Sequence, residues 1–234
     1  MMNFFAKYAE ANLLKRAASA AILIFIVLYI NYIGGFWFKL LIVAVLTLAI
    51  KEGIYVIGSN KKISDRKKCD LWLFLGLIYL VFATVTLLCI RELNNGMMAV
   101  YFLFSLVWIT DITAYFAGIA IGGPKLCPKI SPKKTLSGAG VALLFAGVIG
   151  VLFSYLLCGG FYLEFLLHSL LLSLVAQLGD IFESYFKRSF NVKDTGAIIP
   201  GHGEILDRID SLLSVSIFYW VISDYYLKHL FISS

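Results

Sequence analysis

Long apolar runs separated by short polar segments make up most of this 234-residue chain. A helix needs about 20 apolar residues to cross the hydrocarbon core of a bilayer. The runs of about that length are approximately residues 17–34, 36–56, 71–90, 97–121, 138–158, 161–183 and 211–231. The pattern therefore predicts an all-α fold, a polytopic membrane helix bundle with about seven transmembrane helices.

The composition agrees with a membrane bundle. Hydrophobic residues make up 61% of the chain and charged residues 15%, whereas soluble domains have roughly 45 to 50% apolar and 25% charged residues. Lys15 and Arg16 precede the first apolar run, as in a signal peptide, but no small-residue cleavage site clearly follows it. We therefore expect the first run to be a retained span.

Positive charge is distributed unevenly between alternate loops. If the N-terminus is cytoplasmic, all Lys and Arg residues fall in inside segments except Lys39, Arg91 and Lys228. Such an excess is typical of cytoplasmic loops, so we expect the N-terminus to be cytoplasmic. The net charge of +6 then lies on one membrane face, where it would attract anionic lipid headgroups and anionic soluble substrates. We expect no nucleic-acid partner.

The positions of the acidic residues distinguish the two halves of the chain. The first three spans carry no acid in mid-membrane, so residues 1–96 are predicted to be a transmembrane scaffold. Residues 97–234 contain Asp111, Asp180 and Asp207 within spans or at their cytoplasmic ends. Because charged groups in spans are unfavourable, they indicate function. We predict that residues 97–234 are the catalytic region of one membrane unit.

Two pairs of acids have the spacing of a single helix face. Asp180 and Glu183 are three residues apart, as are Asp207 and Asp210. Facing carboxylates repel one another unless a cation lies between them. Mg²⁺ prefers such oxygen ligands and often binds substrate phosphates as well. The spacing therefore favours a metal site for phosphate chemistry.

Two other interpretations of these acids remain open. In the first, they form structural ion pairs with nearby basic residues, namely Arg188, Lys193 and Arg208. In the second, the protein is an ion-coupled membrane transporter in which Asp111 and Asp180 bind ions within broken helices. The second interpretation does not account for the basic loops of the C-terminal half.

Those basic loops are residues 125–138 and 187–194. In the first, Thr135 or Ser137 is a candidate N-cap for the following helix, and a helix N-terminus preceded by two lysines can hold phosphate. The alternative is that these lysines only set the membrane topology. Near the second loop, His202 lies in a Pro-Gly-His-Gly segment whose glycines allow the backbone to approach a ligand closely. We therefore predict a functional role for His202.

Small residues recur every four positions in the run at 138–158. They are Gly138, Ala142, Ala146 and Gly150. Such a face lets a neighbouring helix approach closely. We expect it to serve packing, and it would also be compatible with a homodimer.

The charged residues of the C-terminal half resemble the signature of the phosphatidate cytidylyltransferase family, also called CDP-diacylglycerol synthases. The family patterns are S-x-x-K-R-x4-K-D and H-G-G-x-x-D-R-x-D. The matching residues are Ser184, Lys187, Arg188, Lys193, Asp194, Gly196, Pro200, His202, Gly203, Asp207, Arg208 and Asp210. Upstream, Asp111 begins a D-x-x-A-Y-x-x-G element, and residues 131–135 match S-P-K-K-T.

The chain departs from the family pattern at a few positions. Glu204 replaces the second glycine of H-G-G, Leu136 and Ser137 replace Trp-Glu, and Ile119 occupies a position that is often basic. Glu204 adds negative charge beside the expected phosphate site. It would either reach a metal or Arg208, or weaken nucleotide binding.

The resemblance implies that CTP and phosphatidic acid are converted to CDP-diacylglycerol and pyrophosphate with Mg²⁺, and that a second cation is compatible with the site. It implies Asp180 and Asp207 as metal ligands. The implied catalytic residues are Asp180, Lys193, His202, Asp207 and Arg208. The implied substrate-binding residues are Asp111, Ser131, Lys133, Lys134, Thr135, Lys187, Arg188 and Asp210. A nucleotide-dependent lipid kinase remains open on the chemistry alone.

The resemblance also implies where the protein works. We expect an integral membrane protein of the bacterial inner membrane, in contact with membrane lipids, whose active site faces the cytoplasm. CTP would enter from the cytoplasm, and the lipid would enter through a lateral gap among the C-terminal helices.

Overall fold

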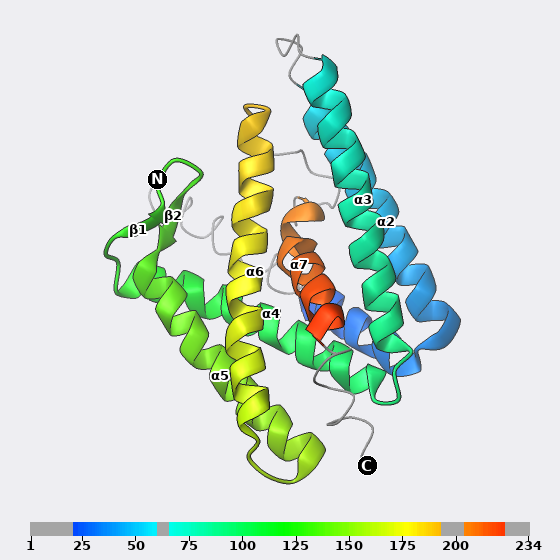
Figure 1. The fold of residues 1–234 in the computed structure, drawn as a ribbon, viewed down its shortest axis with the longest axis vertical. Coiled ribbons are helices and arrows are strands. Elements are labelled where there is room, and N and C mark those ends of the chain that lie inside the picture. Colours follow the sequence, from blue (N-terminus) through cyan, green and yellow to red (C-terminus); the bar gives the residue numbers. More distant parts are fainter. Residues whose placement is uncertain (1–20, 60–65, 193–203, 223–234) are drawn as a thin grey trace, which may run out of the picture.

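A computed structural model describes residues 21–59, 66–192 and 204–222. A helix over Ala21–Ile33 comes first. The elements that follow are α2 (Gly35–Ser59), α3 (Arg66–Arg91), α4 (Gly96–Ala120), β1 (Lys125–Cys127), β2 (Ser131–Thr135), α5 (Leu136–Cys158), α6 (Leu163–Ser189) and α7 (Leu206–Ile222). Figure 1 shows them as a tilted helix bundle with one small hairpin at its edge.

Membrane-length helices lie where the five middle apolar runs predict them. Among the described residues, the five helices α2 to α6 are long and apolar enough to cross a membrane. The runs at 17–34 and 211–231 extend beyond the described ranges, and their described helices, Ala21–Ile33 and α7, are shorter. A polytopic helical membrane fold is therefore supported, while the count of seven spans and the cytoplasmic N-terminus stay predictions.

The all-α prediction missed a hairpin. Strands β1 and β2 pair in antiparallel fashion in a segment that we expected to be a basic loop. Thr135 ends β2 and is also the N-cap of α5, where its Oγ1 accepts a hydrogen bond from Gly138 N at 3.1 Å. Of the two candidate N-caps, Thr135 is therefore confirmed. The Ser137 hydroxyl instead donates to the Gly122 carbonyl.

The small-residue face of α5 is used for packing within the chain. Its residues Gly138, Ala142, Ala146 and Gly150 are buried, and α5 packs against α4 and α6. A Cβ atom added at Gly150 would lie 2.6 Å from the Phe165 carbonyl oxygen of α6. The predicted packing role is confirmed, and a homodimer stays a prediction.

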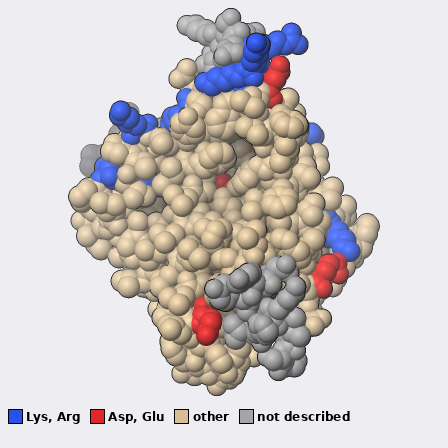
Figure 2. Space-filling view, viewed as in Figure 1, with Lys and Arg blue, Asp and Glu red and all other residues tan. Residues whose placement is uncertain are grey.

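Basic side chains gather at one end of the bundle. The end of α2, the start of α3, the hairpin and the end of α6 all lie toward the upper end in Figure 1. Figure 2 shows Lys and Arg side chains there above a broad uncharged belt. Exposed basic residues of these segments include Lys67, Lys68, Lys125, Lys129 and Lys133. This arrangement agrees with the charge asymmetry of the loops.

The division at residue 96 does not separate two packing units. Helices α2 and α3 both contact α7, which lies in the centre of the view in Figure 1. Tyr79 of α3 is 2.8 Å from Ser214 of α7, hydroxyl to hydroxyl. The N-terminal helices thus help to hold α7, which carries Asp207 in its first turn.

Candidate active site

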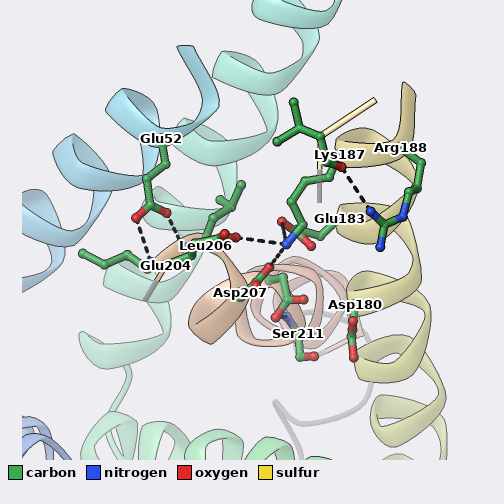
Figure 3. Close-up of polar contacts among 12 residues, drawn as sticks. Glu52, Asp180, Glu183, Lys187, Arg188, Glu204, Leu206, Asp207 and Ser211 are labelled. Atoms are coloured by element: carbon green, nitrogen blue, oxygen red, sulfur yellow. Dashed lines mark hydrogen bonds and ion pairs between the residues drawn. The ribbon is translucent and has the colours of Figure 1, made fainter. Parts of the chain in front are cut away.

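Lys187 lies at the centre of a group of three carboxylates, two of them on buried residues, where α6 meets the start of α7 (Figure 3). Its Nζ is 3.1 Å from Glu183 Oε1 and 3.0 Å from Glu204 Oε2, and it also contacts Asp207 Oδ1. The residues Glu183, Lys187 and Glu204 are each 6% exposed. One ammonium group therefore contacts three carboxylates, and the group as a whole carries excess negative charge.

The three carboxylates also have the arrangement of a cation site. Glu183, Glu204 and Asp207 each offer an oxygen atom, and these atoms lie within 4.8 Å of one another. Carboxylate oxygens are the ligands that Mg²⁺ prefers, and a bound cation would offset the excess charge. The donor set therefore fits Mg²⁺. Asp207 was the expected metal ligand of this set, while the sequence offered Glu183 only through its spacing with Asp180 and offered a metal as one possible partner of Glu204.

Glu204 has a partner that the sequence did not indicate. We expected it to reach a metal or Arg208, or to weaken nucleotide binding. Its carboxylate accepts a hydrogen bond from Lys187 of α6, and its contact with a metal stays a prediction. The ammonium group of Lys187 therefore offsets the negative charge of Glu204, the residue that replaces the glycine of the family pattern.

Asp180, the other predicted metal ligand, is paired separately. Its Oδ2 is 2.5 Å from Nζ of Lys134, which reaches it from β2 of the hairpin. Asp180 and Asp207 are therefore each neutralised by a different lysine. Their joint role as metal ligands stays a prediction.

Two further acids lie beside Asp180. Asp111 on α4 and the buried Asp210 on α7 are both within electrostatic range of the Asp180 carboxylate. Asp210 Oδ1 also accepts a hydrogen bond from Ser211 N at 2.7 Å. The structure thus brings together acids from α4, α6 and α7 that lie far apart in the sequence.

The remaining predicted residues surround this group. Arg188 connects the end of α6 to the hairpin, because its Nε donates to the Ile130 carbonyl at 3.4 Å. Lys133 is exposed on β2, where Ser131 is partly buried, and Arg208 is exposed in the first turn of α7. Lys193 and His202 lie outside the described residues.

Glu52 is a residue of this region that the sequence analysis missed. It lies on α2 and is completely buried, and its two carboxylate oxygens accept hydrogen bonds from Ile205 N at 2.8 Å and Leu206 N at 2.7 Å (Figure 3). We had assigned residues 1–96 to the scaffold because their spans lack acids in mid-membrane. The available signal was an acid next to Lys51 at the end of an apolar run.

An apolar pocket leads to the carboxylates. Its volume is about 190 Å³, and α2, α3, α6 and α7 form its walls. The wall residues are mostly apolar, among them Ile54, Trp72 and Phe182, while Glu183 and Asp210 also line it. Figure 2 shows a hollow in the uncharged surface with acidic atoms at its bottom. N-terminal helices form part of this pocket, and the expected lipid entry through a gap among the C-terminal helices stays a prediction.

Comparison with known proteins yields one consistent family. Residues 61–226 match the model of the cytidylyltransferase family. A protein named phosphatidate cytidylyltransferase from Brucella abortus biovar 1 (strain 9-941) is 47% identical over 150 residues, which cover 62% of this chain and 54% of that protein. One of the same name from Rickettsia bellii (strain RML369-C) is 41% identical over 168 residues, covering 67% of this chain and 71% of the relative.

Proposed function

Because the chain belongs to the cytidylyltransferase family, we propose that it transfers the cytidylyl group of CTP to phosphatidic acid. A phosphate oxygen of the lipid attacks the α-phosphorus of CTP. The bond between that phosphorus and the oxygen bridging to the β-phosphate breaks, and pyrophosphate leaves. The products are CDP-diacylglycerol and pyrophosphate.

The reaction requires positioning and charge neutralisation more than a strong base. The attacking phosphate oxygen is already anionic near neutral pH, so a proton need not be removed from it. Catalysis of such transfers rests on alignment of the reactants and on stabilisation of charge. Basic side chains at the described site, Lys133, Lys134 and Arg208, are suited to the triphosphate and the lipid phosphate. Lys193 and His202 are proposed to assist them.

The single observation that carries this proposal is the carboxylate group at Lys187. A cation held by Glu183, Glu204 and Asp207 would neutralise triphosphate oxygens, and Mg²⁺ supplies this chemistry when bound. In the proposal Asp180 is a further ligand, released from Lys134 when that lysine turns to a substrate phosphate. The carboxylate group lies toward the basic end of the bundle. In the proposal the protein lies in a bacterial inner membrane, and this end faces the cytoplasm.

The apolar pocket is proposed to hold the lipid chain next to the glycerol phosphate. Its uncharged walls match an acyl chain, and its acidic end lies beside the proposed cation site. The lipid phosphate would reach the site from the membrane side while CTP arrives from the aqueous side. Both substrates then meet at the start of α7.

The test is formation of CDP-diacylglycerol from labelled CTP and phosphatidic acid by the purified protein in detergent, with and without Mg²⁺. We expect labelled lipid and pyrophosphate only when both substrates and the metal are present. Label placed at the γ-phosphate separates the reaction from that of a lipid kinase, because cytidylyl transfer leaves it in pyrophosphate. Well-folded protein that forms no labelled lipid would contradict the proposal.

Narrowing the pocket should affect the lipid and not the nucleotide. Gly76 of α3 lines the pocket, and a Cβ atom added there meets nothing within 4 Å. In Gly76→Leu the new side chain would exclude about two methylene groups of the lipid, each contributing roughly 0.8 kcal/mol when buried. We expect KM for long-chain phosphatidic acid to rise about tenfold, with KM for CTP unchanged.

The matched control for Gly76→Leu is Gly58→Leu. Gly58 is an exposed glycine of α2 that also has open space around it but does not line the pocket. The measurement is KM for long-chain phosphatidic acid in both variants, from steady-state kinetics. Equal KM values for the lipid in the two variants would place the acyl chain elsewhere.

The transporter alternative is not favoured. It requires broken helices at its ion ligands, but Asp111 and Asp180 lie within the continuous helices α4 and α6. The family match also points to a transferase. Pyrophosphate release that depends on both substrates would distinguish the two functions, since a transporter would produce none.

A further inference from the structure

Glu52 forms the most direct link between the N-terminal helices and the candidate active site. It lies in α2, 153 residues before Ile205 in the sequence, and its side chain is completely buried. Both carboxylate oxygens are directed at backbone N–H groups at the start of α7 (Figure 3).

The start of α7 needs such an acceptor. The first N–H groups of a helix have no partner within the helix, and they carry partial positive charge. They are commonly satisfied by an oxygen of the N-cap side chain. Helix α7 begins at Leu206, so the preceding residue is Ile205, whose side chain has no acceptor. Glu52 of another helix supplies the oxygens instead.

The two peptide groups held by Glu52 lie between two members of the carboxylate group. Ile205 directly follows Glu204, and Leu206 directly precedes Asp207. Both acids reach Lys187 of α6. A carboxylate that fixes these two N–H groups therefore fixes the backbone from which Glu204 and Asp207 project.

We propose that Glu52 is a positioning residue for the active site, which holds the first turn of α7 so that Glu204 and Asp207 can act together on a divalent cation. Glu52 itself touches neither substrate nor cation in this proposal. The inference rests on the proposed function for its catalytic consequence, but its effect on cation binding can be measured without substrates.

The test uses Glu52→Gln in the full-length protein. The amide retains one acceptor oxygen but presents an NH₂ group to the second N–H, so one hydrogen bond and the negative charge are lost. Groups that orient metal ligands typically contribute 10- to 100-fold to metal affinity or activity. We expect Mn²⁺, used as a probe for Mg²⁺ and followed by electron paramagnetic resonance, to bind about tenfold more weakly. We also expect kcat to fall about tenfold with KM for CTP unchanged.

The control is Asn31→Ala. Asn31 is also completely buried and bonds between elements, since its Nδ2 donates to the Met97 carbonyl at 3.1 Å, but it is not a member of the carboxylate group. It should lower thermal stability in detergent without changing Mn²⁺ affinity. Glu52→Asp keeps the negative charge, so we expect it to bind Mn²⁺ more tightly than Glu52→Gln does. It replaces Glu52→Gln in the test if that variant does not fold.

Wild-type Mn²⁺ affinity in Glu52→Gln, or an equal loss in Asn31→Ala, would overturn the positioning role. Weakened Mn²⁺ binding in Glu52→Gln, together with wild-type protein that makes no CDP-diacylglycerol, would support the role of Glu52 while rejecting the proposed reaction. The two failures are therefore distinguishable.

Discussion

Replacing Asp207 by Asn is expected to lower kcat for CDP-diacylglycerol formation by roughly 100- to 1,000-fold, as removal of one preorganised electrostatic group typically does. Asp207 is the most exposed member of the carboxylate group, with 43% of its side chain accessible. Of the three carboxylates, that of Asp207 is therefore the most accessible to both a cation and a substrate. The amide keeps the size of the side chain but removes its charge.

The Asp207→Asn effect should appear in catalysis rather than in folding. Lys187 would retain Glu183 and Glu204 as partners, so the melting temperature should change little. The assay is product formation from labelled CTP at saturating Mg²⁺. The matched control is Asp70→Asn, which replaces an exposed acid of α3 that is not a member of the carboxylate group. Activity in Asp207→Asn equal to that of the control would remove Asp207 from the proposed mechanism.

Replacing Lys187 by Met should damage both the fold and the activity. Lys187 contacts three carboxylates, two of them on buried residues, and removing its charge leaves these groups to repel one another. Breaking a buried ion pair by removing one partner typically costs about 3–5 kcal/mol. We expect a loss of unfolding free energy of about that size, measured by denaturation in detergent, and a loss of activity of at least 100-fold.

A second substitution tests the cause of the Lys187→Met effect. Glu204→Gly restores the glycine of the family pattern and removes one of the carboxylates that Lys187 contacts, so the double variant should be more stable than Lys187→Met alone. Lys67→Met, at an exposed position of α3, is the control for loss of a lysine. A double variant no more stable than Lys187→Met would show that repulsion with Glu204 is not the cause.

The sequence was sufficient to predict most of the helices and the part of the chain that contains the candidate site. Apolar runs of membrane length predict helices because the bilayer leaves few alternatives for the backbone. The acids at the ends of those runs, such as Asp180 and Asp207, were recognisable because charge is rare in such segments. Apolar runs and the acids at their ends can each be recognised within a short stretch of the chain, so a single sequence is enough to identify them.

The pairing of the charged residues could not be predicted. Lys187 was expected to bind substrate, yet in the structure it contacts three acids, while Lys134 reaches Asp180 from the hairpin. Which lysine meets which acid depends on how α6, α7 and the hairpin pack, and sequence spacing does not record this. Glu52 was missed for the same reason, because its partners are backbone groups in a distant part of the chain.

The bond between α2 and the start of α7 has a consequence for how the protein assembles during synthesis. Chains are made from the N-terminus, and their early parts fold first. Glu52 therefore enters the bundle long before the residues that it will hold, which follow 153 and 154 positions later. Until those residues emerge, its carboxylate lacks these two donors. The candidate active site is thus completed only after Ile205 and Leu206 have been made and α7 has docked against α2.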